Sequence, residues 1–195
     1  MRITDVRPGV LGHDEPMASL FLALAVITTG LYAGFLLTFL VVVMPGLAVL
    51  PDDGFTAAMR RFNEKVPGPG FLVVFLGVIA FPVATLVTGK SGWGWPLVAG
   101  ALACAVLSHA VTIAGNIPLN KALAAAEPVS GPVPAPASVS VPVAAAPGEG
   151  GAVAEAGEKA DSAARTAFEA RWNILHQVRT ALSLAAFILL VFAAN

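Results

Sequence analysis

Polar side chains recur on one side of the last hydrophobic segment of the chain. At about 100° per residue, these positions fall within an arc of roughly 120° on a helix. They are Glu169, Trp172, Asn173, His176, Arg179, Thr180 and Ser183. The opposite side is built from Leu, Ala, Ile and Phe. A histidine beside an arginine, an indole N–H and carboxamides, all in an apolar setting, can take a proton and then hold the resulting oxyanion.

The preceding hydrophobic segment carries a second polar stripe. Its members share one helix side and are His109, Thr112, Asn116 and Asn120. Gly115 and Pro118 interrupt this helix, because proline lacks a backbone N–H and collides with the carbonyl four residues earlier, that of Ala114. Broken helix geometry is tolerated at membrane depth where protein or a water-filled cavity satisfies the backbone. The two stripes predict one shared pocket; polar packing between helices and a hinge without chemical role are the alternatives.

The first hydrophobic segment adds aromatic surface to the predicted pocket. One of its faces carries Thr28, Tyr32, Phe35 and Phe39. These side chains would line the interior with rings and one phenol, although a tyrosine that only packs remains an alternative. Gly30 and Gly34 have the small-xxx-small spacing of a close helix contact, which leaves a homo-oligomer open.

Other chemistries lack their motifs. The sequence contains no nucleophile elbow, glycine-rich phosphate loop, CxxC or HExxH. Two histidines on different helices, His109 and His176, could ligate a metal or haem, but no carboxylate or cysteine joins them convincingly. Cys104 is the single cysteine, so no internal disulfide can form. We therefore expect neither a cofactor nor a metal.

The elements that position these residues must be membrane helices. The chain is 57% hydrophobic and 12% charged, whereas about 25% of residues are charged in soluble domains. Four segments approach the ~20 apolar residues that cross a bilayer. They are expected at about residues 17–44, 68–89, 93–120 and 171–194. We predict an all-α, integral membrane four-helix bundle in a single membrane domain, with the lipid bilayer as its surroundings.

The fourth span has a charge within it. Only residues 180–195 are free of charge, which is too short to cross a bilayer, so the helix must begin near Arg171. His176 and Arg179 then lie below the interface. A charge at that depth usually faces a partner or a water-filled cavity, and the alternative is that Arg179 snorkels to the headgroups.

The remaining segments predict a linker and an orientation. Residues 127–160 consist mainly of Pro, Ala, Val, Ser, Gly and Glu, which predicts a disordered linker. The net charge of −1 and the lack of a basic stripe argue against nucleic acid. Lys and Arg concentrate in the two longer loops, so we expect both termini outside and these loops in the cytoplasm, in a bacterial cytoplasmic membrane.

Two motifs resemble those of a known family. The sequence from Thr112 to Leu123 contains Asn116-Ile-Pro118-Leu-Asn120, and Arg171-Trp172-Asn173 is followed by Arg179-Thr180. Together they resemble the anthrone oxygenase family of small four-helix membrane proteins. The resemblance extends to Tyr32-Ala-Gly34 and Met44-Pro45 in the first segment.

The resemblance implies oxidation of an anthrone or similar reduced polyketide aromatic to a quinone by O2, without flavin, haem or metal. It implies His176 or His109 as the base. The groups that would hold the enolate oxygen and later the peroxide are Asn116, Asn120, Trp172, Asn173 and Arg179. Substrate contacts are expected from His109, Thr112, Tyr32, Phe35 and Thr180. Two other readings remain: a non-catalytic membrane carrier or assembly protein, and a metal- or haem-dependent oxidoreductase.

Overall fold

The computed structural model describes residues 14–89, 94–126 and 149–195, and all regular structure in these ranges is helical. The first continuous run comprises α1 (Asp14–Thr38), the π-helix η1 (Phe39–Val43) and α2 (Met44–Ala48). It is followed by α3 (Asp52–Lys65) and α4 (Pro69–Thr88). The second run comprises α5 (Trp95–Val111), the π-helix η2 (Thr112–Asn116) and α6 (Ile117–Ala125), and α7 is Glu149–Ala193. The predicted all-α class is confirmed.

Within the described ranges, four helical stretches are long and apolar enough to cross a membrane. They are Pro16–Ala48, Pro69–Thr88, Trp95–Ala125 and Glu155–Ala193. Large aliphatic side chains on them are exposed, for example Leu31 at 59% and Val87 at 78%. Side chains of this kind on long helices are suited to lipid rather than water. The protein is therefore an integral membrane protein built from helices, as predicted.

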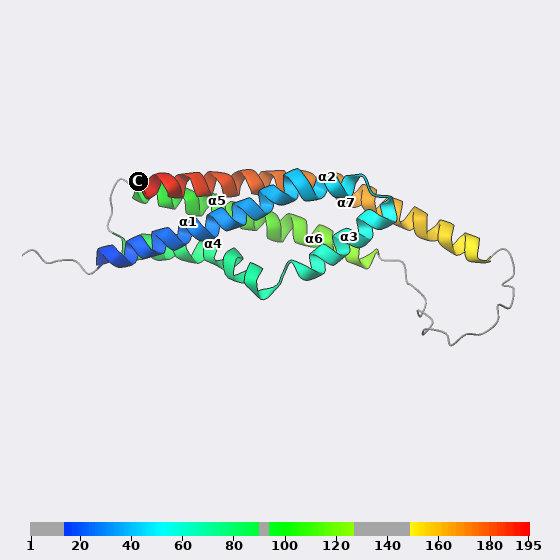
Figure 1. Cartoon of the computed structure of the whole chain (residues 1–195), viewed down its shortest axis with the longest axis horizontal. Helices are drawn as coiled ribbons and strands as arrows, with labels where there is room; N and C mark the ends of the chain where they lie inside the picture. Colours follow the sequence, from blue (N-terminus) through cyan, green and yellow to red (C-terminus); the bar gives the residue numbers. More distant parts are fainter. Residues whose placement is uncertain (1–13, 90–93, 127–148) are drawn as a thin grey trace, which may run out of the picture. The chain divides into compact units, whose positions relative to one another are not determined.

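Two π-helical turns interrupt the first and third of these stretches, one between α1 and α2 and the other between α5 and α6, helices that Figure 1 labels. One residue separates each turn from a proline. The N–H of Met44 bonds the carbonyl of Phe39 ahead of Pro45, and the N–H of Ile117 bonds that of Thr112 ahead of Pro118. Proline cannot donate a hydrogen bond and crowds the carbonyl four residues earlier, and an extra residue in the preceding turn widens the helix. The interruption expected near Gly115 and Pro118 thus takes the form of a π-helical turn.

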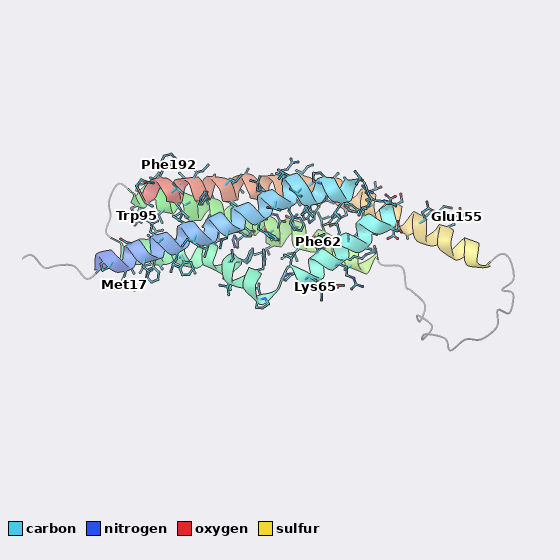
Figure 2. All side chains as sticks on the ribbon, in the orientation of Figure 1. Met17, Phe62, Lys65, Trp95, Glu155 and Phe192 are labelled. Carbon is cyan, nitrogen blue, oxygen red and sulfur yellow. The ribbon has the colours of Figure 1, made fainter. Side chains whose placement is uncertain are left out.

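The chain divides into two compact units. The first comprises Met1–Gly34, Leu72–Leu107 and Leu182–Asn195. Its core is formed by small and medium side chains together with one tyrosine, namely Ala25, Tyr32, Val78, Ala101 and Leu190. Met17, Trp95 and Phe192 lie toward one end of this unit (Figure 2).

Of the two glycines expected to mediate close packing, Gly30 packs closely against another helix within the first unit, and Gly34 does not. A Cβ on Gly30 would lie 2.9 Å from the ring of Phe187, whereas nothing lies within 4 Å of a Cβ on Gly34. The helix contact in this unit therefore uses one glycine of the small-xxx-small pair.

The second unit comprises Phe35–Phe71 and Ser108–Ala181, and it holds most of the predicted site. Its apolar core joins residues of η1, α2, α3, α6 and α7. These are Phe39, Met44, Leu47, Phe55, Met59, Leu123, Phe168 and Trp172. Helix α3, on which Figure 2 labels Phe62 and Lys65, turns its apolar side into this core. Phe168 and Trp172 of α7 belong to this core, so the core packs against the helix that carries the polar residues.

Helix α7 is longer than the membrane span expected from the sequence. It begins at Glu149 rather than near Arg171, so residues 149–160 of the expected linker 127–160 are helical. Proline is absent after Pro147, and an ion pair of 2.7 Å joins Lys159 to Glu155 one turn earlier. Proline-free, alanine-rich sequence with such pairs favours helix. The rest of the expected linker, 127–148, lies outside the described residues.

Candidate active site

Trp172 of α7 is held by both asparagines of the Asn-x-Pro-x-Asn sequence. Its indole N–H donates to Oδ1 of Asn120 at 3.0 Å. Its backbone carbonyl accepts from Nδ2 of Asn116 at 3.4 Å. Because η2 and α6 carry these two asparagines in succession, the polar stripes of the two segments meet in the second unit. Trp172 is only 3% exposed, so its position is determined by these contacts.

Aromatic rings enclose the imidazole of His176. The ring of Trp172 stacks on it with centroids 4.7 Å apart and an interplanar angle of 14°. Phe39 of η1 lies 6.1 Å from the same imidazole, edge to face. Phe168 stacks with Trp172 at 5.9 Å. His176 is fully buried, so its surroundings have a low polarity in which a hydrogen bond or a charge acts strongly.

The hydrogen bonds of His176 determine its tautomer. Arg179 directs Nε and Nη2 to Nδ1 of the imidazole, at 3.0 and 2.8 Å. A guanidinium can only donate, so Nδ1 must accept and the ring hydrogen must sit on Nε2. Nε2 lies 2.9 Å from the carbonyl oxygen of Leu36, to which it donates. Both ring nitrogens are therefore in use, and Nδ1 becomes available as a base only when Arg179 moves away.

Arg179 is directed into the protein rather than along the helix toward the headgroups. Its Nη1 lies 3.5 Å from Oγ1 of Thr112 in η2, and its Cζ lies 5.4 Å from the centroid of the Trp172 ring. The Thr112 hydroxyl donates to the carbonyl of Ser108 at 3.0 Å, which leaves its lone pairs to accept from the guanidinium. These contacts place a positive charge beside the aromatic stack.

Three buried amide atoms of the second unit have no hydrogen-bond partner among the residues that the structure describes. They are Nδ2 of Asn63, Oδ1 of Asn116 and Oδ1 of Asn173. Asn116 is 1% exposed, and its Nδ2 is already committed to the Trp172 carbonyl. Buried polar atoms are nearly always paired, so unpaired ones indicate places where water or a ligand binds.

A family model for anthrone oxygenase matches residues 55–189. The chain belongs to the anthrone oxygenase family. The matched range includes η2, α6 and the polar side of α7, and with them every contact between Trp172 and the two asparagines. Neither a curated protein nor a solved structure matches the chain at a significant level. Membership indicates an oxygenase-type function.

The remaining predicted residues of this anthrone oxygenase family member lie in different places. The Thr180 hydroxyl donates to the carbonyl of His176 at 2.7 Å and so serves the helix backbone. His109 is buried on α5. Tyr32 lies in the first unit, 5.9 Å from the ring of Phe75. Phe35 is 37% exposed and contacts Phe39 and Phe71 by ring packing. Among the described residues, no group of three or more His, Cys, Asp or Glu side chains could hold a metal ion.

One residue that sequence reasoning did not assign to the site region is Arg165. It fastens the turn between α2 and α3 to α7, donating to the carbonyls of Ala48 and Leu50 at 2.9 and 2.8 Å. It also pairs with Asp52 at 3.1 Å, and its guanidinium lies 4.4 Å from the centroid of Phe55. Arg165 therefore holds the core in which Trp172 is packed.

A second overlooked cluster contains a buried ion pair. Arg60 of α3 approaches Asp161 of α7 at 3.4 Å and donates from Nε to the carbonyl of Leu123 at 3.1 Å. The hydroxyl of Thr56 donates to the same Asp161 oxygen at 2.8 Å. Asp161 and Arg165 continue the spacing of the α7 polar stripe toward the N-terminus. The stripe extended upstream contains both residues, but the helix was expected to begin near Arg171 and so excluded them.

Proposed function

We propose that this protein is a membrane-embedded oxygenase that converts an anthrone, or a similar reduced polyketide aromatic, to the quinone with O2 and without a cofactor. The observation that supports this most is the paired arrangement of Arg179 and His176 inside an aromatic enclosure. In this arrangement the Arg179 guanidinium covers the lone pair on Nδ1 of His176. Nδ1 can act as a base once the guanidinium turns to another acceptor. Family membership supports the oxygenase chemistry.

The proposed reaction requires only a few functional groups from the protein. The methylene C–H of an anthrone is acidic because its anion is an aromatic enolate. This electron-rich anion can pass an electron to O2, after which a C–O bond forms and a hydroperoxide results. Loss of water from the hydroperoxide gives the quinone, so that anthrone and O2 yield quinone and H2O. A base, a group that stabilises the enolate oxygen and an apolar enclosure are sufficient.

Arg179 and His176 supply the first two of these by exchanging partners. The guanidinium binds a neutral ring nitrogen in the present arrangement. A developing enolate oxygen is the stronger acceptor, because it carries negative charge that attracts the guanidinium, whereas the imidazole nitrogen is neutral. When Arg179 turns to that oxygen, Nδ1 of His176 is uncovered and accepts the proton. His109 remains the alternative base.

The asparagines divide into two roles in this proposal. Oδ1 of Asn116 and Oδ1 of Asn173 are unpaired acceptors and can bind the hydrogen of a hydroperoxide. Trp172 has committed its only side-chain donor to Oδ1 of Asn120, so Trp172 positions the stack, whereas Asn120 keeps its Nδ2 group as a donor for the enolate oxygen. This differs from the expectation that all of these residues hold the enolate.

Oxygen uptake tests the proposal. Detergent-purified, metal-stripped protein is offered an anthrone beside a protein-free autoxidation control, an Arg179→Ala variant and an Arg61→Ala variant. Arg61 is a suitable control because it is a surface arginine with a 78% exposed side chain. We expect uptake above autoxidation in wild type and Arg61→Ala, and uptake at the autoxidation rate in Arg179→Ala.

Two results would reject it. Wild-type uptake equal to autoxidation would remove this substrate class and favour a carrier or assembly protein. Uptake that appears only after a metal or haem is added would favour a metal-dependent oxidoreductase.

A further inference from the structure

A groove of about 230 Å3 runs between α6 and α7 in the second unit. From α6 it is lined by Leu119, Ala122, Leu123 and Ala126, and from α7 by Ala164, Ala167, Phe168 and Arg171. Four of the eight lining residues are alanines. Alanine projects only one methyl group, so the two helices present smooth apolar walls that suit a flat molecule.

The inner wall of the groove leads to the candidate active site. The ring of Phe168 lines the groove and stacks on Trp172 at an interplanar angle of 29°. Trp172 in turn stacks on His176. A ring lying against Phe168 therefore joins an aromatic stack that ends at the imidazole, and ring pairs of this kind attract each other beyond simple burial.

Arg171 gives the groove a positive charge. Unlike Arg60 and Arg165, which pair with Asp161 and Asp52, Arg171 forms no ion pair within the described part of the chain. Arg171 is exposed on α7. An unpaired cation at an apolar groove is complementary to an aromatic molecule that carries a carboxylate or phenolate.

Another cavity of this unit has the opposite character. It measures about 640 Å3 and is lined by Pro51, Asp52, Asp53, Gly157, Glu158 and Asp161. Its four carboxyl groups disfavour an anion, whereas the groove at Arg171 has none. The two cavities thus differ in charge, and an aromatic anion would select the groove.

We propose that the groove between α6 and α7 binds the flat aromatic substrate as an anion, with its rings against Phe168 and its acidic group at Arg171. This inference rests on the proposed function, which supplies the aromatic substrate. It adds an entry site outside the polar residues of α7, and a requirement for an acidic group on the ligand. The rings of Phe168 and Trp172 separate this entry site from His176, so the substrate must move on from the groove before proton transfer.

Quenching of Trp172 fluorescence reports on the groove without any turnover. A Trp93→Phe/Trp95→Phe variant leaves Trp172 as the only tryptophan, since the chain contains three. Anthraquinone-2-carboxylate is titrated as the probe, with anthraquinone-2-carboxamide as its neutral counterpart. Close contact with Phe168 brings the quinone near the indole, so binding in the groove should quench the emission.

Ala167→Leu and Ala163→Leu form a matched pair on α7. Ala167 lines the groove, whereas Ala163 is exposed and lies outside it. Both changes suit a helix, because leucine is nearly as good a helix former as alanine. We expect Ala167→Leu to raise the Kd of the carboxylate by about tenfold or more, which corresponds to a loss of ~1.4 kcal/mol, and Ala163→Leu to leave it unchanged.

Arg171→Gln separates charge from shape. It should raise the Kd of the carboxylate about tenfold, as expected for a lost charged contact, and leave that of the carboxamide unchanged. The proposal would be overturned if the carboxylate bound wild type and Ala167→Leu equally well. It would also be overturned if Arg171→Gln bound both probes as wild type does.

Oxygen uptake by the same variants separates this inference from the proposed function. Intact groove binding without any anthrone-dependent uptake would reject the oxygenase and retain the groove as an aromatic anion site. Uptake by wild type that persists with an unchanged KM in both Ala167→Leu and Arg171→Gln would reject the groove and retain the oxygenase.

Discussion

Arg179 covers the Nδ1 atom of His176 with two nitrogens of its guanidinium, Nε at 3.0 Å and Nη2 at 2.8 Å. The two residues are three positions apart on α7, so they lie on the same side of the helix. Their pairing leaves the imidazole neutral, with its hydrogen on Nε2 and directed at the Leu36 carbonyl. Nδ1 of His176 is therefore available as a base only when the Arg179 guanidinium moves away from it.

The first prediction concerns the tautomer of His176. Because Nδ1 accepts from Arg179, the ring should be protonated at Nε2 alone in the resting protein. The measurement is the 15N NMR spectrum of histidine-labelled protein in a His13→Gln/His109→Gln background, which leaves one of three histidines. In Arg179→Met the Nδ1 resonance should shift as its donors disappear. A ring protonated at Nδ1 in the wild-type arrangement would contradict this assignment.

A second prediction concerns the bond from the Trp172 indole to Asn120. Asn120→Ala leaves a buried N–H without an acceptor, and Trp172→Phe removes the donor while keeping a ring. We expect a coupling of about 1 kcal/mol between the two changes in a double-mutant cycle, in line with hydrogen bonds in membrane proteins. Reversible unfolding in mixed micelles measures the four stabilities. Strictly additive effects would mean that the bond contributes nothing.

The third prediction tests the buried pair of Arg60 and Asp161. Their side chains are 10% and 11% exposed, so removing one partner leaves a charge in a nearly dry setting. Arg60→Met should cost about 3 kcal/mol of unfolding free energy, and Arg60→Met/Asp161→Leu should recover much of this loss. Thermal unfolding in detergent measures the stabilities of the wild type, the single variant and the double variant. Arg61→Met is the control, and a double variant no more stable than the single one would argue against the pairing.

The fourth prediction compares two helical glycines. A Cβ on Gly115 would lie 2.8 Å from Cδ1 of Leu175, whereas a Cβ on Gly34 meets nothing within 4 Å. Gly34→Ala should be neutral or stabilising by about 0.5–1 kcal/mol, because alanine favours helix over glycine. Gly115→Val should destabilise, since it forces η2 away from α7 and lengthens the bond from Asn116 to Trp172.

Leu175→Ala provides the rescue for the glycine comparison. It removes the two methyl groups that crowd Gly115. Gly115→Val combined with Leu175→Ala should therefore be more stable than additivity predicts. Additive losses would show that the packing at Gly115 is not the cause.

The membrane helices could be predicted from sequence because their signal is local. A stretch of about twenty apolar residues has few structures open to it when its backbone cannot bond to water. The same holds for the stripes, since a period of 3.6 places Trp172, His176 and Arg179 on one side of any helix that contains them. The start of α7 was misplaced because the proline-rich segment before it masked a proline-free, alanine-rich stretch.

The pairing of the polar atoms could not be predicted in this way. The sequence indicated that Trp172, Asn116 and Asn120 face one interior, but it did not show that the indole N–H is spent on Asn120. Nor did it show that Arg60 meets Asp161 across 101 positions of chain. Such pairs depend on how helices approach one another, and residues such as Gly115 set that approach through contacts between distant segments.

The sequence by itself determined that this is a helical membrane protein of the anthrone oxygenase family with a polar stripe on its last helix. The tertiary structure alone decided which of those polar groups are already satisfied by protein partners and which buried amide atoms have no partner among the described residues. The physical reason is range: hydrophobicity and helical period act over neighbouring residues, whereas a buried hydrogen bond forms only when packing brings its two atoms within about 3 Å.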